Sequence, residues 1–143
     1  MGFLDKLFRS AEQYPPLDPA APAAGRLAGV QDSLRSLAEK TKDRLEVVPG
    51  ERKAFVFVGK PPKTFGLVWY APGEEGNLKS LMAQKQLDPR RAGGLVEALS
   101  EAYQESRSEP RYVAELAGRQ FVVTPSDRLA AQVDRILERA GDA

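Results

Sequence analysis

KAFVFV (residues 53–58) and TFGLVWYA (residues 64–71) are the stretches that decide the fold. Both are rich in aromatic and β-branched side chains, which favour strands over helices. Residues 60–63 between them read Lys-Pro-Pro-Lys, and adjacent prolines at that place predict the loop of a β-hairpin. The pair Pro72-Gly73 follows the second stretch and predicts where that strand ends.

Downstream, the sequence predicts a second hairpin and three helices. Residues 111–117 and 119–124 have strand character and are separated by a turn at Gly118-Arg119. In three other segments apolar residues recur at helical spacing, each preceded by a residue whose side chain can cap a helix. These helices, with their capping residues, are 78–86 (Asn77), 88–107 (Asp88, followed by Pro89) and 127–140 (Ser126).

Upstream of the first hairpin, residues 26–46 predict one helix that ends before Pro49-Gly50. Its apolar side chains share one stripe: Leu27, Val30, Leu34, Leu37 and Leu45. Together these elements predict a single α+β domain over residues 26–143. We expect a mainly antiparallel four-stranded sheet made from the two hairpins, with helices packed on one face.

The first 25 residues differ from the rest of the chain. Residues 1–10 contain a two-turn amphipathic pattern whose apolar face consists of Phe3, Leu4, Leu7 and Phe8. A helix of that length is unstable alone in water, so these four side chains are the predicted partner-binding residues. Residues 11–25 hold four prolines among alanines, which predicts a semi-extended tether with a reach of roughly 40 Å.

Three interpretations of the amphipathic segment remain open. It can dock into a groove on a protein partner, pack back on its own domain, or contact a membrane surface peripherally through residues 2–9. Membrane contact is disfavoured because only Lys6 and Arg9 are cationic nearby and Asp5 offsets them. Docking on a protein partner is the preferred interpretation, because a tether raises the local concentration of a weakly binding segment.

The chain has no histidine and no cysteine. This excludes His-based triads, Cys–His pairs, structural zinc sites and iron–sulfur clusters. The remaining candidates for catalysis are carboxylates, lysines, tyrosines and hydroxyls, and none of them has a recognisable catalytic spacing. We therefore expect no enzymatic activity, no cofactor and no metal site. No apolar run approaches the length that spans a bilayer, and no signal peptide opens the sequence, so a cytoplasmic location is expected.

The charge distribution suggests an alternative function. Net charge is +1, but residues 51–91 hold eight basic and four acidic side chains. Aromatic residues in the same region could stack on bases while lysines hold phosphates, as in single-stranded nucleic-acid binding. The candidate residues for this alternative are Lys60, Lys63, Arg90 and Arg91. The pattern within the strands argues against it, since the aromatic faces are expected to form the core.

The function predicted from the sequence is therefore that of a non-enzymatic accessory or adaptor subunit in a multi-subunit complex. The amphipathic segment and the tether favour attachment to a protein partner. A single-stranded nucleic-acid-binding protein is the alternative. An enzyme that relies on carboxylates is the weakest hypothesis, and it requires two carboxylates with raised pKa values converging in a pocket.

Overall fold

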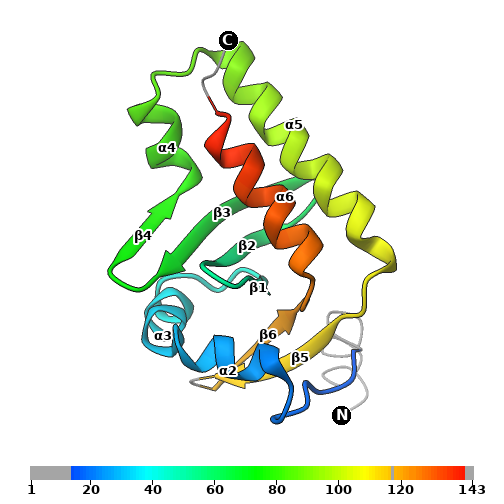
Figure 1. Cartoon of the computed structure of the whole chain (residues 1–143). Helices are drawn as coiled ribbons and strands as arrows, with labels where there is room; N and C mark the ends of the chain where they lie inside the picture. The colour runs from blue at the N-terminus through cyan, green and yellow to red at the C-terminus, as the bar shows by residue number, and fades with distance from the viewer. Residues whose placement is uncertain (1–13, 117, 141–143) are drawn as a thin grey trace.

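The central feature of the fold is a six-stranded mixed sheet (Figure 1). The structure is a computed structural model and describes residues 14–116 and 118–140. Its strands are β1 (Leu45–Pro49), β2 (Ala54–Lys60), β3 (Thr64–Ala71), β4 (Glu74–Asn77), β5 (Tyr112–Leu116) and β6 (Arg119–Val123). They lie in the order β4-β3-β2-β1-β6-β5. Strands β1 and β6 are parallel, and every other neighbouring pair is antiparallel.

Five α-helices are present in the described part of the chain, and the three predicted N-caps are confirmed. The helices are α2 (Pro22–Ala28), α3 (Gln31–Lys40), α4 (Leu78–Gln84), α5 (Pro89–Glu105) and α6 (Asp127–Glu138), and a 3-10 turn, η1 (Ser106–Ser108), follows α5. The side chains of Asn77, Asp88 and Ser126 accept hydrogen bonds from backbone N–H groups in the first turns of α4, α5 and α6. Within residues 14–116 and 118–140, no helix is both long and apolar enough to cross a bilayer.

Helices cover both faces of the sheet, because the central strands are apolar on both sides. On β1, Val48 belongs to the apolar cluster under α4, α5 and α6, whereas Val47 belongs to a second cluster under α2 and α3. On β2, Phe55 and Phe57 face the first cluster and Val56 faces the second. In Figure 1, α5 and α6 run side by side across the first face. The prediction that helices pack on one face only is therefore wrong.

The α+β class and both predicted hairpins are confirmed, but the sheet has two strands more than the predicted four. The hairpins are β2–β3 and β5–β6, and the added strands are β1 and β4. Strand β4 continues the chain after the two-residue turn at Pro72-Gly73, where the sequence predicted only an end. The sheet is mixed rather than purely antiparallel because β1 and β6 connect the two hairpins in parallel.

The predicted helix over residues 26–46 is also wrong. The chain forms α2 and α3 there, and then β1 from Leu45. Leu45 fits the apolar stripe of a helix, but all five residues of β1 are buried between β2 and β6. Burial on both faces in the middle of a sheet overrides the local helical pattern, and Val47 and Val48 are β-branched residues suited to a strand.

The Pro/Ala-rich stretch is folded onto the domain from residue 14 onward. Pro22 stands at the first position of α2, where proline is tolerated because its missing N–H is not needed. Ala23 and Leu27 of α2 are buried. The predicted docking segment lies outside the described residues, as does the start of the predicted tether, so the division of the N-terminal part into segment and tether stays a prediction.

The two edges of the sheet differ. At β5, the backbone N–H of Val113 donates to the carbonyl of Pro15 (2.9 Å), and the N–H of Leu17 donates to the carbonyl of Val113 (2.8 Å). Residues 15–17 thus lie along β5 in parallel, with a bridge from Pro16 to Val113. At β4, no described residue pairs with the backbone on the side away from β3.

Candidate functional site

A buried carboxylate, Glu46 on β1, is the centre of the largest polar network in the described chain. Its side chain is fully buried. Oε1 accepts hydrogen bonds from the Tyr103 hydroxyl (2.7 Å) and lies 2.9 Å from Nη1 of Arg44. Oε2 accepts from Nε of Arg111 (2.9 Å) and from the Thr124 hydroxyl (2.6 Å). Each oxygen of the carboxylate therefore has two partners.

The pKa values in this network indicate a structural role. Burial by itself raises the pKa of Glu46, but the Thr124 hydrogen bond, the charge of Arg44, the Tyr103 hydrogen bond and the charge of Arg111 together lower it below its ordinary value. Burial, followed by the negative charge and the hydrogen bond of Glu46, raises the pKa of Tyr103 to about 12. Glu46 is thus ionised and Tyr103 neutral at pH 7, and neither has the pKa of a general acid or base.

The network extends from Arg111 to the end of α5. Nη1 of Arg111 donates to the carbonyl of Ser106 (2.9 Å), and Nη2 donates to the Ser106 hydroxyl (2.9 Å). The guanidinium also lies 5.1 Å from the ring centroid of Tyr103, within cation–π range. The network joins β1, α5 and η1 to Arg111 just before β5 and Thr124 just after β6, and it occupies both oxygens of the Glu46 carboxylate. The carboxylate at the centre of the network has a lowered pKa, whereas the hypothesis of a carboxylate-based enzyme requires raised values.

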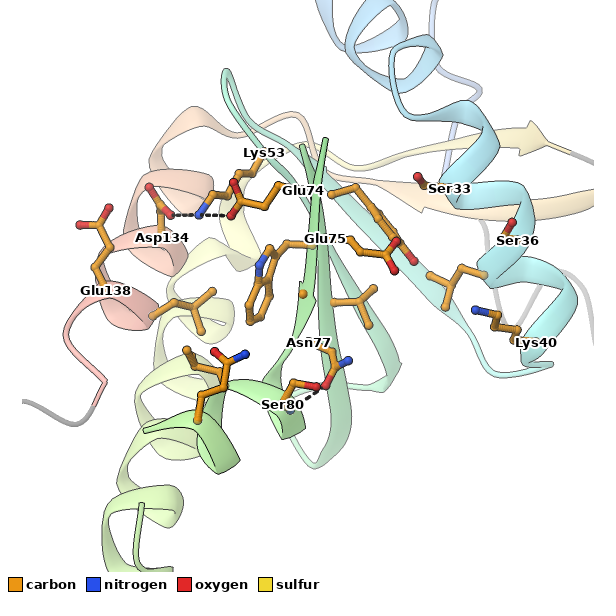
Figure 2. Close-up of a pocket in the computed structure, with 18 of the residues that line it drawn as sticks. Ser33, Ser36, Lys40, Lys53, Glu74, Glu75, Asn77, Ser80, Asp134 and Glu138 are labelled. Atoms are coloured by element: carbon orange, nitrogen blue, oxygen red, sulfur yellow. Dashed lines mark hydrogen bonds and ion pairs between the residues drawn. The ribbon is translucent and has the colours of Figure 1, made fainter. Parts of the chain in front are cut away.

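A large cavity surrounds the open edge strand β4 (Figure 2). Its volume is about 1060 Å³, and it is lined by α3, β3, β4, α4 and α6. Figure 2 shows Lys53, Asp134 and Glu138 on one side of β4, and Ser33, Ser36 and Lys40 of α3 on the other. The cavity therefore consists of two grooves, one on each face of the sheet, that meet at the edge.

An aromatic residue of β3 lies in each groove. Trp69 belongs to the apolar cluster under α4, α5 and α6, and Tyr70, the next residue, belongs to the cluster on the opposite face. Trp69 is 8% exposed and Tyr70 is 9% exposed. Neither the indole N–H nor the tyrosine hydroxyl has a hydrogen-bond partner among the described residues.

The glycine of β4 makes room for the indole. Gly76 is the cross-strand partner of Trp69, and a Cβ at Gly76 would lie 2.5 Å from Nε1 and 2.6 Å from Cε2 of the indole. The Trp69 ring therefore covers the backbone of β4 at a position where only glycine fits without displacement. On the other face, burial and then the negative charge of Glu75 raise the pKa of Tyr70.

Charged side chains surround β4. Nζ of Lys53 lies between two carboxylates, 3.4 Å from Asp134 and 3.8 Å from Glu74. Counted over the whole cavity, the lining includes five carboxylates (Asp32, Glu74, Glu75, Asp134 and Glu138) and three lysines (Lys40, Lys53 and Lys85). The wall therefore has an excess of two negative charges. In residues 14–116 and 118–140, no three acidic side chains are grouped as they would be to hold a metal ion.

The structure separates the residues predicted for nucleic-acid binding into two pairs. Lys60 and Lys63 are exposed at the β2–β3 turn, and Arg90 and Arg91 are exposed in the first turn of α5. The turn lies against the middle of α5, where the Ser100 hydroxyl donates to the carbonyl of Pro62 (3.1 Å). Ten residues of helix separate Ser100 from Arg90, which is about 15 Å. The four cations therefore do not form one cluster.

The aromatic residues expected to form the core do so. Phe55, Phe57 and Trp69 are buried at 2%, 0% and 8% exposure, and Phe65 is partly buried against the same cluster, so these rings serve the core rather than base stacking. The predicted partner-binding residues Phe3, Leu4, Leu7 and Phe8 lie outside the described residues, so their prediction stays untested.

Sequence reasoning missed the grooves beside β4. Gly73-Glu74-Glu75-Gly76 reads as a poor anion-binding loop, and its short, acidic pattern has no apolar alternation that would indicate a strand. One local signal does point to it, because a two-residue Pro-Gly turn after a strand is compatible with a hairpin.

No known protein family matches this sequence, and no curated protein or solved structure is significantly similar to it.

Proposed function

We propose that this chain is a non-enzymatic adaptor that binds protein partners. The observation that carries the proposal is the open sheet edge at β4 with a groove on each face. Strand addition to an open edge is a common mode of peptide recognition, in which the backbone supplies affinity and flanking pockets supply specificity. The saturated network around Glu46 supports the same proposal, because it accounts for the buried titratable groups without a reaction.

An adaptor needs a second attachment, and we assign it to the predicted docking segment with Phe3, Leu4, Leu7 and Phe8. Residues 15–17 lie along β5, at the edge of the sheet opposite β4. The described part of the chain therefore begins beside β5, at the opposite edge of the sheet from β4. A cytoplasmic location, with peripheral membrane contact through residues 2–9 as the alternative use of the segment, belongs to this proposal.

The structure changes how the proposal is tested. Deleting residues 1–24 would remove Ala23, which is 5% exposed in the core, and the strand pairing of residues 15–17. Point variants avoid this loss. We therefore compare the full chain with the double variant Leu7→Glu plus Phe8→Glu, and use Gln104→Glu plus Ala131→Glu as a control with the same charge change at exposed helix positions.

Each protein is affinity-tagged, expressed in its native host and purified from soluble and membrane fractions. The expected result is a defined complex with the wild-type chain and the control, and loss of that complex with the Leu7/Phe8 variant. The control changes two exposed positions, so its thermal midpoint should agree with that of the wild type within about 2 °C. The Leu7/Phe8 variant should agree as well, because the proposal has the segment dock on a partner and not on its own domain. Elution of the wild-type chain at its own mass in both fractions, or an unchanged complex with the Leu7/Phe8 variant, would contradict this assignment.

Nucleic-acid binding is the second candidate. It is favoured by the exposure of Lys60, Lys63, Arg90 and Arg91, none of which forms an ion pair with a described residue. Binding of a single-stranded oligonucleotide should then weaken steeply with salt and with Lys60→Ala plus Lys63→Ala. Absence of binding at low salt would remove this candidate.

A further inference from the structure

The pairing of β4 with β3 determines which backbone groups of β4 face the open edge. Register and a two-residue turn make Ala71–Glu74 the pair that closes the β3–β4 hairpin. In an antiparallel ladder, hydrogen-bonded and non-hydrogen-bonded pairs alternate. The next pair, Tyr70–Glu75, is therefore a non-hydrogen-bonded pair. The N–H and carbonyl of Glu75 then face the open edge, where an added strand can pair with them.

The grooves determine how the side chains of an added strand would be distributed. Successive side chains of a strand point to opposite faces of the sheet. One set would therefore enter the groove beside Trp69 and the other the groove beside Tyr70. The unpartnered indole N–H can donate to a carbonyl of the added segment, and the unpartnered tyrosine hydroxyl can donate or accept.

The charges select among possible occupants. The five carboxylates and three lysines of the cavity leave it negative, and Lys53 is already engaged by Glu74 and Asp134. A second copy of this chain paired through β4 would bring its own Glu74 and Glu75 close to those of the first copy. Charges on an edge strand are a known protection against such self-pairing, and like charges at close range are unfavourable.

We propose that the β4 edge binds an extended segment of a partner protein in which Lys or Arg side chains alternate with apolar ones. The apolar side chains lie against Trp69 or Tyr70, and the basic ones reach the carboxylates around β4. The inference rests on the proposed adaptor function and identifies the chemistry of one of its two partners.

Trp69 is the single tryptophan of the chain, so its fluorescence and its indole N–H resonance report on this site alone. The probe is a blocked octapeptide of alternating lysine and valine, titrated into the full-length protein. We expect saturable changes in both signals. The same peptide N-methylated at every second residue, which cannot form the backbone bonds of a strand, should bind at least about tenfold more weakly.

Two charge-reversal variants separate specific pairing from general attraction. Glu74→Lys plus Glu75→Lys should weaken binding of the lysine–valine peptide about tenfold or more. Glu97→Lys plus Glu101→Lys, at exposed positions of α5, makes the same charge change away from the cavity and should leave binding within about twofold. A peptide of alternating glutamate and valine should not bind.

Equal weakening by both variants, equal binding of the N-methylated peptide, or no change in the Trp69 signals at millimolar peptide would each overturn the inference. A dimer of the wild-type chain that the Glu74/Glu75 variant abolishes would overturn it as well, since the edge would then be occupied by a second copy. Failure here leaves the adaptor proposal standing if the Leu7/Phe8 variant still loses its complex. If the peptide experiment and the Leu7/Phe8 comparison both fail, this inference and the adaptor proposal are both wrong.

Discussion

At the β5 edge, Val113 exchanges hydrogen bonds with Pro15 and Leu17, so residues 15–17 cover that edge at Val113 with their backbone. At the β4 edge, the described chain supplies no such cover, and the strand instead presents the exposed side chains of Glu74 and Glu75. Both devices protect a sheet from edge-to-edge aggregation. They differ in what they permit, because backbone groups that are already paired cannot bind a partner strand, whereas charge excludes only partners of like charge.

The surroundings of the two edges differ as well. Near the covered edge, Arg111 lies just before β5 and connects to Glu46 and Ser106 through buried hydrogen bonds. Near the open edge, the indole N–H of Trp69 and the hydroxyl of Tyr70 have no hydrogen-bond partner among the described residues. We therefore expect residues near the covered edge to contribute mainly to folding stability, and residues near the open edge to contribute mainly to binding.

The largest expected effect is at Glu46. Replacing Glu46 with Gln removes the charge that balances Arg111 in a site where both are buried, and places an amide among donors. Breaking a buried ion pair from one side costs about 3–5 kcal/mol, so chemical denaturation should show that loss in the free energy of unfolding. Glu75→Gln on the open edge is the control and should change the free energy of unfolding by less than about 0.5 kcal/mol. Comparable losses for the two variants would remove the distinction between the edges.

The same variant has a signature in acid. Because the pKa of Glu46 is lowered in the folded protein, the unfolded chain holds that proton more tightly. The stability that Glu46 contributes is present above the ordinary glutamate pKa of about 4.3 and is lost as pH falls through the lower folded value. The difference in unfolding free energy between wild type and Glu46→Gln should therefore narrow as pH is lowered. A constant difference would show that folding does not lower the pKa of Glu46.

An intermediate effect is expected at Gly76 on the open edge. Gly76→Ala places a Cβ 2.5–2.7 Å from three atoms of the Trp69 indole, so the ring must move. Overpacking of this kind costs about 1–3 kcal/mol, and the emission of Trp69 should shift towards that of a solvent-exposed indole. Gly66→Ala, in β3 with no atom within 4 Å of the added Cβ, is the matched control and should leave both measurements nearly unchanged. An unshifted spectrum in Gly76→Ala would contradict the close approach of Trp69 to β4.

The smallest effect concerns the cover of the β5 edge. Leu17→Pro and Leu17→Ala both remove the leucine side chain, but only the proline variant removes the N–H that donates to Val113. The free energies of unfolding of the two variants should differ by the contribution of one backbone hydrogen bond, about 0.5–1.5 kcal/mol. Hydrogen exchange at Val113 should also be faster in the proline variant, since its N–H donates to the neighbouring Pro15. Equal stability and equal exchange would mean that residues 15–17 do not hold this edge.

Sequence patterns predicted the elements whose signals are local. The hairpins β2–β3 and β5–β6 follow from strand residues flanking a turn, and α4, α5 and α6 follow from helical spacing and from the caps at Asn77, Asp88 and Ser126. They did not predict β1, because Leu45 continues a helical stripe until the neighbouring strands are placed on either side. They did not predict the grooves either, since Trp69 and Gly76 meet only after the chain has turned back.

By itself, then, the sequence determined the α+β class, the two hairpins, the helix starts and the absence of histidine and cysteine chemistry. Tertiary structure alone decided that β1 is central, that helices cover both faces, that Glu46 is saturated by Tyr103, Thr124 and two arginines, and that one edge is covered and the other open. The physical reason is the sequence separation over which each interaction acts. Turns, caps and helical periodicity act between residues a few positions apart. The pairing of β1 with β6 and of Glu46 with Arg111 joins residues that lie far apart in the chain, and no local pattern specifies such partners.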